Sequence, residues 1–166
     1  MPDLQPLCAG HAPAVLAFEL ANRAYFAGSV PDRGDAWFDR FGDRYGALLA
    51  EQDAGVCAFH VLVAEDGSVL GRFNLVDIED GTAELGYRVA QDVSGRGVAT
   101  ATVRDLCRLA ATRYGLRTLR AATSHANAAS RRVLLKAGFV PAGLADPAHL
   151  SGEPGTWFQR DLPVQP

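Results

Sequence analysis

The sequence predicts an α/β protein, in which an antiparallel strand meander is followed by a parallel β-α-β pairing to give a mixed sheet with helices on both faces. Three patterns lead to this class. Apolar residues recur at helical spacing in the first third, strand-like runs fill the middle, and strand and helix patterns alternate in the last third. With 166 residues and no internal repeat or linker, we expect a single domain over 1–166.

The first third of the chain is predicted to be helical. Residues 11–28 present a broad apolar side, and Gly28 and Pro31 follow as stop signals. Residues 32–55 are expected to form a second helix, or a helix pair interrupted by glycines. The aromatic residues of this second segment recur at spacings of three and four, which is typical of core contacts.

The middle of the chain changes to strand-like patterning. Residues 57–90 hold three β-rich runs, separated by the pairs Asp66-Gly67 and Asp80-Gly81. Asp-Gly between such runs indicates a tight hairpin turn, because that turn needs positive φ angles. We therefore expect an antiparallel three-stranded meander.

The last third alternates helix and strand. The pattern predicts, in order, a helix over 98–114, a strand over 116–123, a helix over 128–137 and closing strands within 138–145 and 155–163. Asn127 is a good N-cap for the second helix, and Gly115 and Gly138 are good C-terminal stops. The strand–helix–strand order implies a parallel pairing beside the meander.

Charge and cysteine content restrict the class of protein. A net charge of −3 argues against a protein that binds a nucleic-acid backbone. Cys8, Cys57 and Cys107 show no CxxC spacing, so we interpret them as thiols of a reducing compartment rather than as a disulfide or zinc framework. Without a visible signal sequence or bilayer-spanning run, we expect a cytoplasmic protein, monomeric or homodimeric, with no metal and no membrane contact.

The segment SGRGVAT, residues 94–100, lies between the predicted third meander strand and the next helix. The first amides of a helix have no intrahelical acceptors, and glycines let a ligand approach the backbone closely. Such a loop suits a phosphate group. The P-loop pattern is absent, and GxGxxG fails because Thr100 occupies the third glycine position. Considered alone, the loop is either a phosphate site or only a turn.

The loop is one of three motifs that follow one another in a fixed order. They are ELGYRV at 84–89, SGRGVA at 94–99 and NAASRRVLLKAGF at 127–139. Together they resemble the GNAT superfamily of acyl-CoA-dependent N-acetyltransferases, and within it the RimJ/RimL-like branch. The resemblance covers residues 57–143 and implies a GNAT-like fold with acetyl-CoA as cosubstrate.

The implied reaction is direct attack by a primary amine on acetyl-CoA in a ternary complex. The amine is expected to be a protein or peptide N-terminal α-amine, or that of a small molecule. One alternative is a catalytically silent acyl-CoA-binding sensor. Another, an unrelated nucleotide-binding α/β protein, is disfavoured by the two failed phosphate motifs.

The resemblance implies that the loop holds the coenzyme A pyrophosphate, in agreement with the properties of a helix N-terminus. The implied contacts come from Ser94, Gly95, Arg96, Gly97, Val98, Ala99 and Thr100. The family usually begins this loop with Arg or Gln, where this chain has Ser94. We therefore expect the backbone amides and Arg96 to hold the phosphates.

In the family, the fourth strand parts from the fifth. The resemblance implies that the freed backbone of Tyr87, Arg88 and Val89 pairs with the pantetheine amides of the coenzyme. A free N–H in this region can also bind the thioester carbonyl. Asn127 is implied as a contact of the pantetheine arm in addition to its capping role, and Ser130 as a further coenzyme contact.

Acetyl transfer requires a base, because an ammonium with a lysine-like pKa of about 10 is protonated at neutral pH. The resemblance implies Glu84 as a base acting through water; the alternative is an acid that only faces solvent. The family often places a tyrosine acid where this chain has Leu134, so Ser130 is the substitute, unless the thiolate leaves without an acid. His125 is either a proton relay or an exposed or capping residue.

The family's first two helices wall the acceptor site. Here that implies Trp37 and Phe38 as candidate substrate contacts, with core packing as the alternative. Arg131 and Arg132 are interpreted as a solvated helix face, from which one side chain could reach a coenzyme phosphate.

Overall fold

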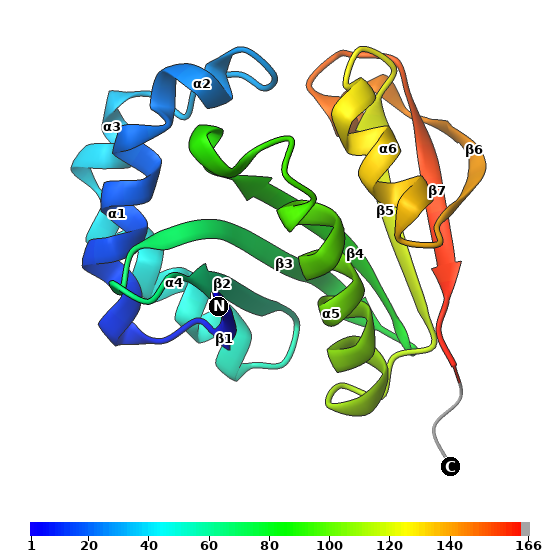
Figure 1. Ribbon diagram of the computed structural model, residues 1–166, viewed down its shortest axis with the longest axis horizontal. Coiled ribbons are helices and arrows are strands. Elements are labelled where there is room, and N and C mark those ends of the chain that lie inside the picture. The colour runs from blue at the N-terminus through cyan, green and yellow to red at the C-terminus, as the bar shows by residue number, and fades with distance from the viewer. Residues whose placement is uncertain (164–166) are drawn as a thin grey trace.

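The computed structural model describes residues 1–163, which form one seven-stranded sheet with helices on both faces (Figure 1). The strands are β1 (Asp3–Pro6), β2 (Ala58–Val63), β3 (Val69–Glu79), β4 (Thr82–Val89), β5 (Thr118–Ser124), β6 (Val140–Ala145) and β7 (Gly155–Asp161). The helices are α1 (Ala12–Ala21), α2 (Arg23–Ala27), α3 (Asp35–Asp39), α4 (Phe41–Asp53), α5 (Val98–Thr112) and α6 (Ala128–Lys136), with 3₁₀ turns η1 (Ala9–His11), η2 (Gln91–Val93) and η3 (Pro147–Leu150). Within residues 1–163, no helix has the length and apolarity needed to cross a bilayer.

The sheet order is β1-β2-β3-β4-β5-β7-β6. Only β4 and β5 run parallel, and α5 connects them; the other neighbours are antiparallel. The predicted fold class, a meander followed by a parallel β-α-β pairing, is confirmed. The chain places β7 between β5 and β6, so β6 forms one edge of the sheet.

The two Asp-Gly pairs form different connections. Asp80 and Gly81 have φ angles of 51° and 77° and join β3 to β4 in the predicted two-residue hairpin. At the first pair only Gly67 has a positive φ, and the connection is longer. There the Asp66 carboxylate accepts hydrogen bonds from the Ser68 N–H and hydroxyl, which stabilises the wider loop.

The first predicted helix is broken at Asn22 into α1 and α2. The Asn22 side chain donates to the Phe18 carbonyl at 2.9 Å and accepts from the Gln91 N–H at 2.9 Å. A buried amide that bonds the backbone in this way competes with helix continuation. Because of this break, α2 takes a different direction from α1 and lies across the end of β4, close to the loop before α5.

The second predicted helical segment is a pair, α3 and α4, but the glycines do not separate it. The break lies at Arg40, whereas Gly42 and Gly46 are inside α4. The strand β1 was not predicted, because four residues that begin with Asp3 and end with Pro6 carry no clear alternation. In the structure β1 pairs with β2 along the edge of the sheet.

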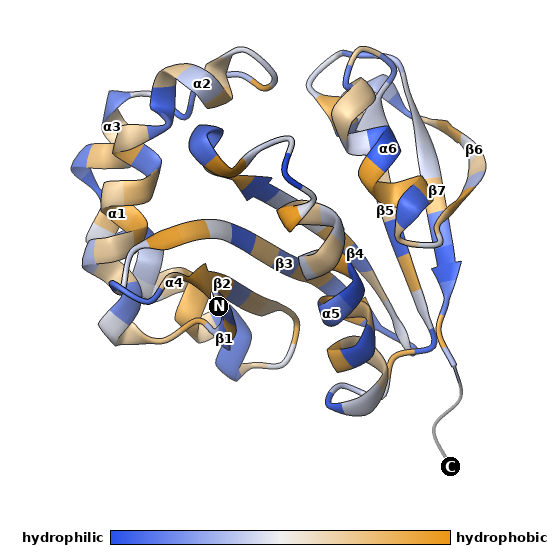
Figure 2. Cartoon of the chain, in the orientation of Figure 1, coloured by the Kyte–Doolittle hydropathy of each residue, from blue (hydrophilic) through white to orange (hydrophobic). Residues whose placement is uncertain are grey.

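Two apolar cores lie on opposite faces of the sheet. One joins α5 and α6 to the face that carries Phe73, Leu75 and Leu119. The other joins α1 and α4 to the face that carries Phe59 and Val61. Period-two alternation along the strands therefore supplies both layers. Figure 2 shows orange, apolar stretches along the central strands, with helices of mixed colour on either side.

A buried carboxylate fastens α1 to the sheet. The Glu19 side chain is 1% exposed and lies 2.8 Å from the Arg72 guanidinium on β3 and 3.1 Å from that of Arg88 on β4. Arg33 approaches the same carboxylate at 3.5 Å. A buried charge of this kind is tolerated because charged donors satisfy it, and removal of one partner typically costs about 3–5 kcal/mol.

The parallel pair β4–β5 is short. Thr82, Ala83 and Glu84 of β4 pair with Thr118, Leu119 and Arg120 of β5, and no later register is formed in the described chain. Beyond this point β4 stays paired with β3, and β5 stays paired with β7 up to Ser124. The two strands therefore diverge, as Figure 1 shows for β4 (green) and β5 (yellow-green). Each strand has a free backbone edge in the gap.

His60 makes the stability of the fold depend on pH. Its Nε2 lies 2.8 Å from the Tyr114 hydroxyl, its Nδ1 is buried without a partner among residues 1–163, and burial lowers its pKa to about 4. Because the unfolded ring titrates near ~6.5, the native state disfavours the proton, and up to about 3 kcal/mol of stability is lost as pH falls from ~6.5 to ~4.

Urea unfolding of the wild type and of His60→Gln at several pH values measures this loss. We expect the free energy of unfolding of the wild type to fall relative to that of His60→Gln as the pH decreases from ~6.5 to ~4. A difference that stays constant from pH ~6.5 to ~4 would contradict the assignment.

Candidate active site

Two cavities meet in the gap between β4 and β5. The loop cavity, of about 430 Å³, is bounded by α2, the end of β4, the loop before α5 and α6. The gap cavity, of about 530 Å³, is bounded by residues 27–31, the diverging parts of β4 and β5, α6 and residues 149–153. Both are lined by Ser29, Val30, Tyr87, Asn127 and Ser130. Because these walls are shared, one ligand can extend from the loop cavity into the gap cavity.

The loop before α5 offers a run of free backbone donors. Gly95 and Gly97 have φ angles of 75° and 77°, and Gly97 is the N-cap of α5 without a capping side chain. The N–H groups of residues 95–100 donate no backbone hydrogen bond within the described chain, whereas the Ser94 hydroxyl donates to the Gln91 carbonyl at 2.7 Å. Consecutive free amides at a helix N-terminus form an anion-binding concavity.

The predicted loop residues are placed unevenly around this concavity. Ser94, Gly95, Gly97, Ala99 and Thr100 line the loop cavity. The Arg96 side chain is exposed outside its wall, and Val98 packs against the core beneath α5. Arg96 and Val98 therefore contribute their backbone N–H groups, and not their side chains, to the run of free amides.

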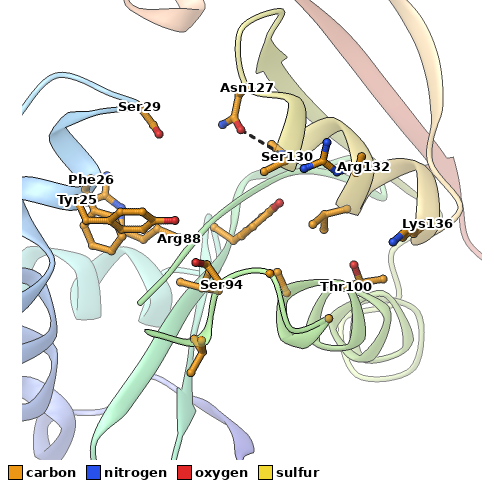
Figure 3. A pocket seen from close by; sticks show the side chains of 18 of the residues that line it. Tyr25, Phe26, Ser29, Arg88, Ser94, Thr100, Asn127, Ser130, Arg132 and Lys136 are labelled. Atoms are coloured by element: carbon orange, nitrogen blue, oxygen red, sulfur yellow. Dashed lines mark hydrogen bonds between the residues drawn. The ribbon is translucent and has the colours of Figure 1, made fainter. Parts of the chain in front are cut away.

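The positive charge of the loop cavity comes from other elements. Arg132 and Lys136 of α6 line it (Figure 3), whereas the Arg88 guanidinium of β4 is paired with Glu19. Arg131, the neighbour of Arg132, lies outside the wall. The sequence pattern did not distinguish Arg131 from Arg132. The way α6 docks on α5 decides which of the two faces the cavity.

Neighbouring residues of β4 face opposite sides of the sheet. The Tyr87 ring stacks on Phe73 with centroids 5.5 Å apart, on the side of α5 and α6. Burial raises the pKa of the Tyr87 hydroxyl, and a hydrogen bond with the Ser130 side chain opposes this shift. Arg88 points to the other side, where it pairs with Glu19 and lies 4.5 Å from the Phe26 ring centroid. Burial lowers the Arg88 pKa, and Glu19 opposes this effect.

Asn127 begins α6 as predicted, since its side-chain oxygen accepts from the Ser130 N–H at 3.1 Å. Its amide nitrogen has no partner in residues 1–163 and is a donor at the junction of the two cavities (Figure 3). The capping role and a ligand contact are therefore compatible. Leu134, at the family's tyrosine position, is buried in the core.

Glu84 forms a contact that sequence reasoning missed. Its Oε1 lies 2.5 Å from Nε2 of His149, which belongs to the 3₁₀ turn η3 between β6 and β7. The His149 ring is 4.9 Å from the Trp157 ring centroid on β7. His149 lines the gap cavity, whereas Glu84 is not part of its wall. No sequence signal identified His149, because 65 residues separate it from Glu84.

Trp37 and Phe38, the predicted acceptor contacts, lie outside the walls of both cavities. Trp37 packs edge-on against Phe38 and Phe41, and the Arg23 guanidinium lies 4.3 Å from the Phe38 ring centroid. Trp37 also packs against the apolar core beneath α1 and α4, and the role of both rings as acceptor contacts stays a prediction. Aromatic contacts to the loop cavity come instead from Tyr25 and Phe26 of α2 (Figure 3).

His125 is also outside both cavity walls, and its Nε2 lies 3.0 Å from the Thr156 hydroxyl. Gly86, by contrast, lines the gap cavity, and a Cβ added there would meet nothing within 4 Å. In the described part of the chain, no group of three or more His, Cys, Asp and Glu side chains is placed to hold a metal ion.

Residues 3–140 match the family model described as an acetyltransferase (GNAT) domain. The match covers more than half of the chain, so the chain belongs to the GNAT acetyltransferase family.

Known proteins of similar sequence and structure fit this membership. An uncharacterized N-acetyltransferase of Bacillus licheniformis, p20, is 32% identical over 88 residues; the match covers 52% of this chain and 49% of that protein, so the chain matches about half the length of this relative. A ribosomal-protein-S5-alanine acetyltransferase of Vibrio fischeri has a TM-score of 0.88 at 20% identity, covering 98% of this chain and 94% of that one.

Two further structures were solved with coenzyme A species. RimJ of Mycobacterium smegmatis, in complex with CoA-disulfide, has a TM-score of 0.84 at 24% identity, covering 95% of this chain and 80% of that one. Spermidine N-acetyltransferase of Vibrio cholerae, in complex with CoA and spermine, has a TM-score of 0.78 at 16% identity, covering 96% and 95%. At these identities the likeness establishes the fold.

Gly97 adopts a left-handed conformation that an L-residue disfavours, so its replacement should lower the stability of the protein. Gly97→Ala introduces no clash, since its Cβ would meet nothing within 4 Å, but it forces an L-residue to φ 77°. We expect a loss of about 1–2 kcal/mol in the free energy of unfolding. The matched control is Gly46→Ala in the interior of α4, which should be stabilising by up to about 1 kcal/mol. Urea unfolding measures both, and equal effects of the two substitutions would contradict the assignment.

Proposed function

We propose that this protein is an acetyl-CoA-dependent N-acetyltransferase of the RimJ/RimL-like branch, which transfers an acetyl group to a primary amine by direct attack in a ternary complex. The acceptor is a protein or peptide N-terminal α-amine, or a small-molecule amine. Support for the branch comes from the ribosomal-protein acetyltransferases among the structural neighbours. Support for an amine acceptor also comes from the spermidine acetyltransferase of the same fold.

One observation carries the proposal: the loop cavity and the gap cavity meet where β4 and β5 diverge. A transfer enzyme that works through a ternary complex must bring a donor and an acceptor to one point from two sides. The shared wall of Tyr87, Asn127 and Ser130 is such a point. A domain that only senses a coenzyme has no need of the second cavity.

The loop cavity fits acetyl-CoA, whose thioester supplies the acetyl electrophile and a thiol leaving group. The free N–H groups of residues 95–100, with Arg132 and Lys136, would hold the phosphates. The free backbone edge of β4 at Tyr87, Arg88 and Val89 would pair with the pantetheine amides as a strand does. The Asn127 amide nitrogen would add a donor to this arm.

The gap cavity fits a cationic amine. Glu153 lines it, and Glu84 contacts His149 of its wall, so its local charge attracts an ammonium group. Gly86 leaves open space on β4 between the side chains of Glu84 and Arg88, which is room for an acceptor beside the thioester. Trp37 and Phe38 have no part in this proposal.

The proton of the ammonium is removed on the Glu84 side, and the leaving thiolate is protonated on the Ser130 side. Ser130 lines both cavities together with Tyr87, whose hydroxyl keeps its proton at neutral pH because burial raises its pKa. A proton delivered by Ser130 could thus be replaced from Tyr87. A thiolate is also a good leaving group by itself, so we expect a smaller effect at Ser130 than at Glu84.

Thermal-shift measurements with acetyl-CoA, CoA, ATP and NAD, followed by thiol-release assays on peptide N-termini and polyamines, test the function. We expect stabilisation by both coenzyme A species and thiol release with at least one amine. Absence of any stabilisation by acetyl-CoA would disprove the proposal. Stabilisation without thiol release from any acceptor would indicate the sensor instead.

Glu84→Gln should lower kcat by about 100-fold, because loss of acid–base catalysis typically costs 10²–10⁴ in rate. The coenzyme Kd should stay unchanged, since Glu84 lies outside the loop cavity. Glu79→Gln, an exposed acid at the end of β3, is the matched control and should keep wild-type activity. Equal activity of both variants would exclude Glu84 from the proton path.

Arg132→Gln and Lys136→Gln should each weaken CoA binding roughly fivefold, because each removes one charged donor from a partly solvated anion site. The effect should shrink as salt screens the charges. Arg131→Gln, on the same helix but outside the cavity wall, is the control and should bind CoA as the wild type does. Calorimetric titration measures all three, and a weakening as large in Arg131→Gln would contradict the assignment.

A further inference from the structure

Glu84 is shielded from the acceptor cavity by a second titratable group. Its side chain is 22% exposed and is not part of the wall of the gap cavity, whereas His149, which contacts it and is 40% exposed, is part of that wall. The two side chains are in contact at 2.5 Å between Glu84 Oε1 and His149 Nε2. An acceptor amine that enters the gap cavity therefore meets the imidazole before the carboxylate.

We propose that His149 accepts the proton of the acceptor ammonium and that Glu84 is a positioning residue acting through it. The inference rests on the proposed acetyl transfer and names the atom that accepts the proton. The base is then the imidazole of His149, held by the Glu84 carboxylate, and not the Glu84 carboxylate acting through water.

The hydrogen bond fixes the tautomer of the ring. Because the Glu84 carboxylate only accepts, the proton of neutral His149 lies on Nε2 and leaves Nδ1 with a lone pair. Nδ1 has no hydrogen-bond partner among residues 1–163. A carboxylate–imidazole pair of this kind orients the base and stabilises the imidazolium that forms.

The turn that carries His149 is itself held in place. The Asp146 carboxylate accepts from the Ala148 N–H at 3.0 Å at the start of η3, and the Gly152 N–H donates to the Pro147 carbonyl at 2.7 Å at its end. Trp157 of β7 packs against the imidazole. Gly155 allows Leu150 to lie close to β7, since a Cβ at Gly155 would collide with its side chain. The base is thus fixed relative to β4 and β5.

The proton balance is complete with these groups. His149 Nδ1 takes one proton from the ammonium, and the free amine forms a C–N bond to the thioester carbonyl carbon. The C–S bond then breaks, and the electron pair leaves with the coenzyme sulfur. The second amine proton goes to that sulfur by way of Ser130, giving an amide and a free thiol. The imidazolium returns its proton to solvent through the open cavity.

Several charged groups surround His149. The Glu84 carboxylate from β4 contacts it, Glu153 lines the same cavity, and Asp146 begins its own turn. The Arg120 guanidinium of β5 lies 4.3 Å from the centroid of the Trp157 ring, which packs on the imidazole. Of these groups, Glu84 is in hydrogen-bond contact with the ring, so it is the one that orients the base.

Rate measurements test the proposal. His149→Ala should lower kcat by about 100-fold and be partly restored by added imidazole, with the acetyl-CoA Kd unchanged. Glu84→Gln should lower kcat without any response to added imidazole, because its His149 ring is still present. The double variant should be within about threefold of His149→Ala, because paired groups act as a unit. His125→Ala, outside both cavities, should keep wild-type activity.

Mapping of histidine modification by diethyl pyrocarbonate gives a readout that needs no acceptor. His149 should react through its free nitrogen, and Glu84→Gln should change its rate of reaction, because the carboxylate no longer holds the ring. If His149→Ala retains full activity, or if Glu84→Gln leaves the His149 modification rate unchanged, the proposal is overturned. If no amine is acetylated while the modification results hold, the proposed function fails and the Glu84–His149 pair stands.

Discussion

The divergence of β4 from β5 is the constraint on which the rest of the site depends. The strands pair from Thr82 to Glu84 and then separate, while each keeps its other neighbour, β3 or β7. Neither strand is therefore disordered by the separation, and both present backbone groups to a ligand. The same divergence joins the loop cavity to the gap cavity and places α5 and α6 at the two sides of the opening (Figure 1).

Two acidic residues hold the elements around this opening, in different ways. Glu19 is buried against Arg72 and Arg88 and fixes α1 to β3 and β4, so the Arg88 side chain serves the fold while its backbone faces the cavity. Glu84 is partly exposed and bonds His149, which fixes the β6–β7 connection to β4. The first contact is structural because water is excluded; the second lies beside a cavity where protons can exchange.

Most of the fold could be predicted from local sequence patterns. The apolar alternation of residues 57–90 and the Asp80-Gly81 pair defined the meander, because a period of two and a positive-φ turn are properties of neighbouring residues. Asn127 and the glycine-rich loop were equally local, since a cap and a free amide run need only a few consecutive positions. The break at Asn22 was not visible, because its cause is a bond to Gln91, which is 69 residues away along the chain.

The sequence by itself determined the strand and helix order, the family resemblance and the loop before α5. The tertiary structure decided which side chains face the cavities. The docking of α6 places Arg132 and Lys136 in the wall of the loop cavity, whereas Arg131 and Arg96 lie outside it. Trp37 and Phe38 pack against other aromatic rings outside the cavity. The tertiary structure also brought His149 to Glu84 across 65 residues. Such selections depend on how distant elements pack, and residue type and short-range spacing do not encode that packing.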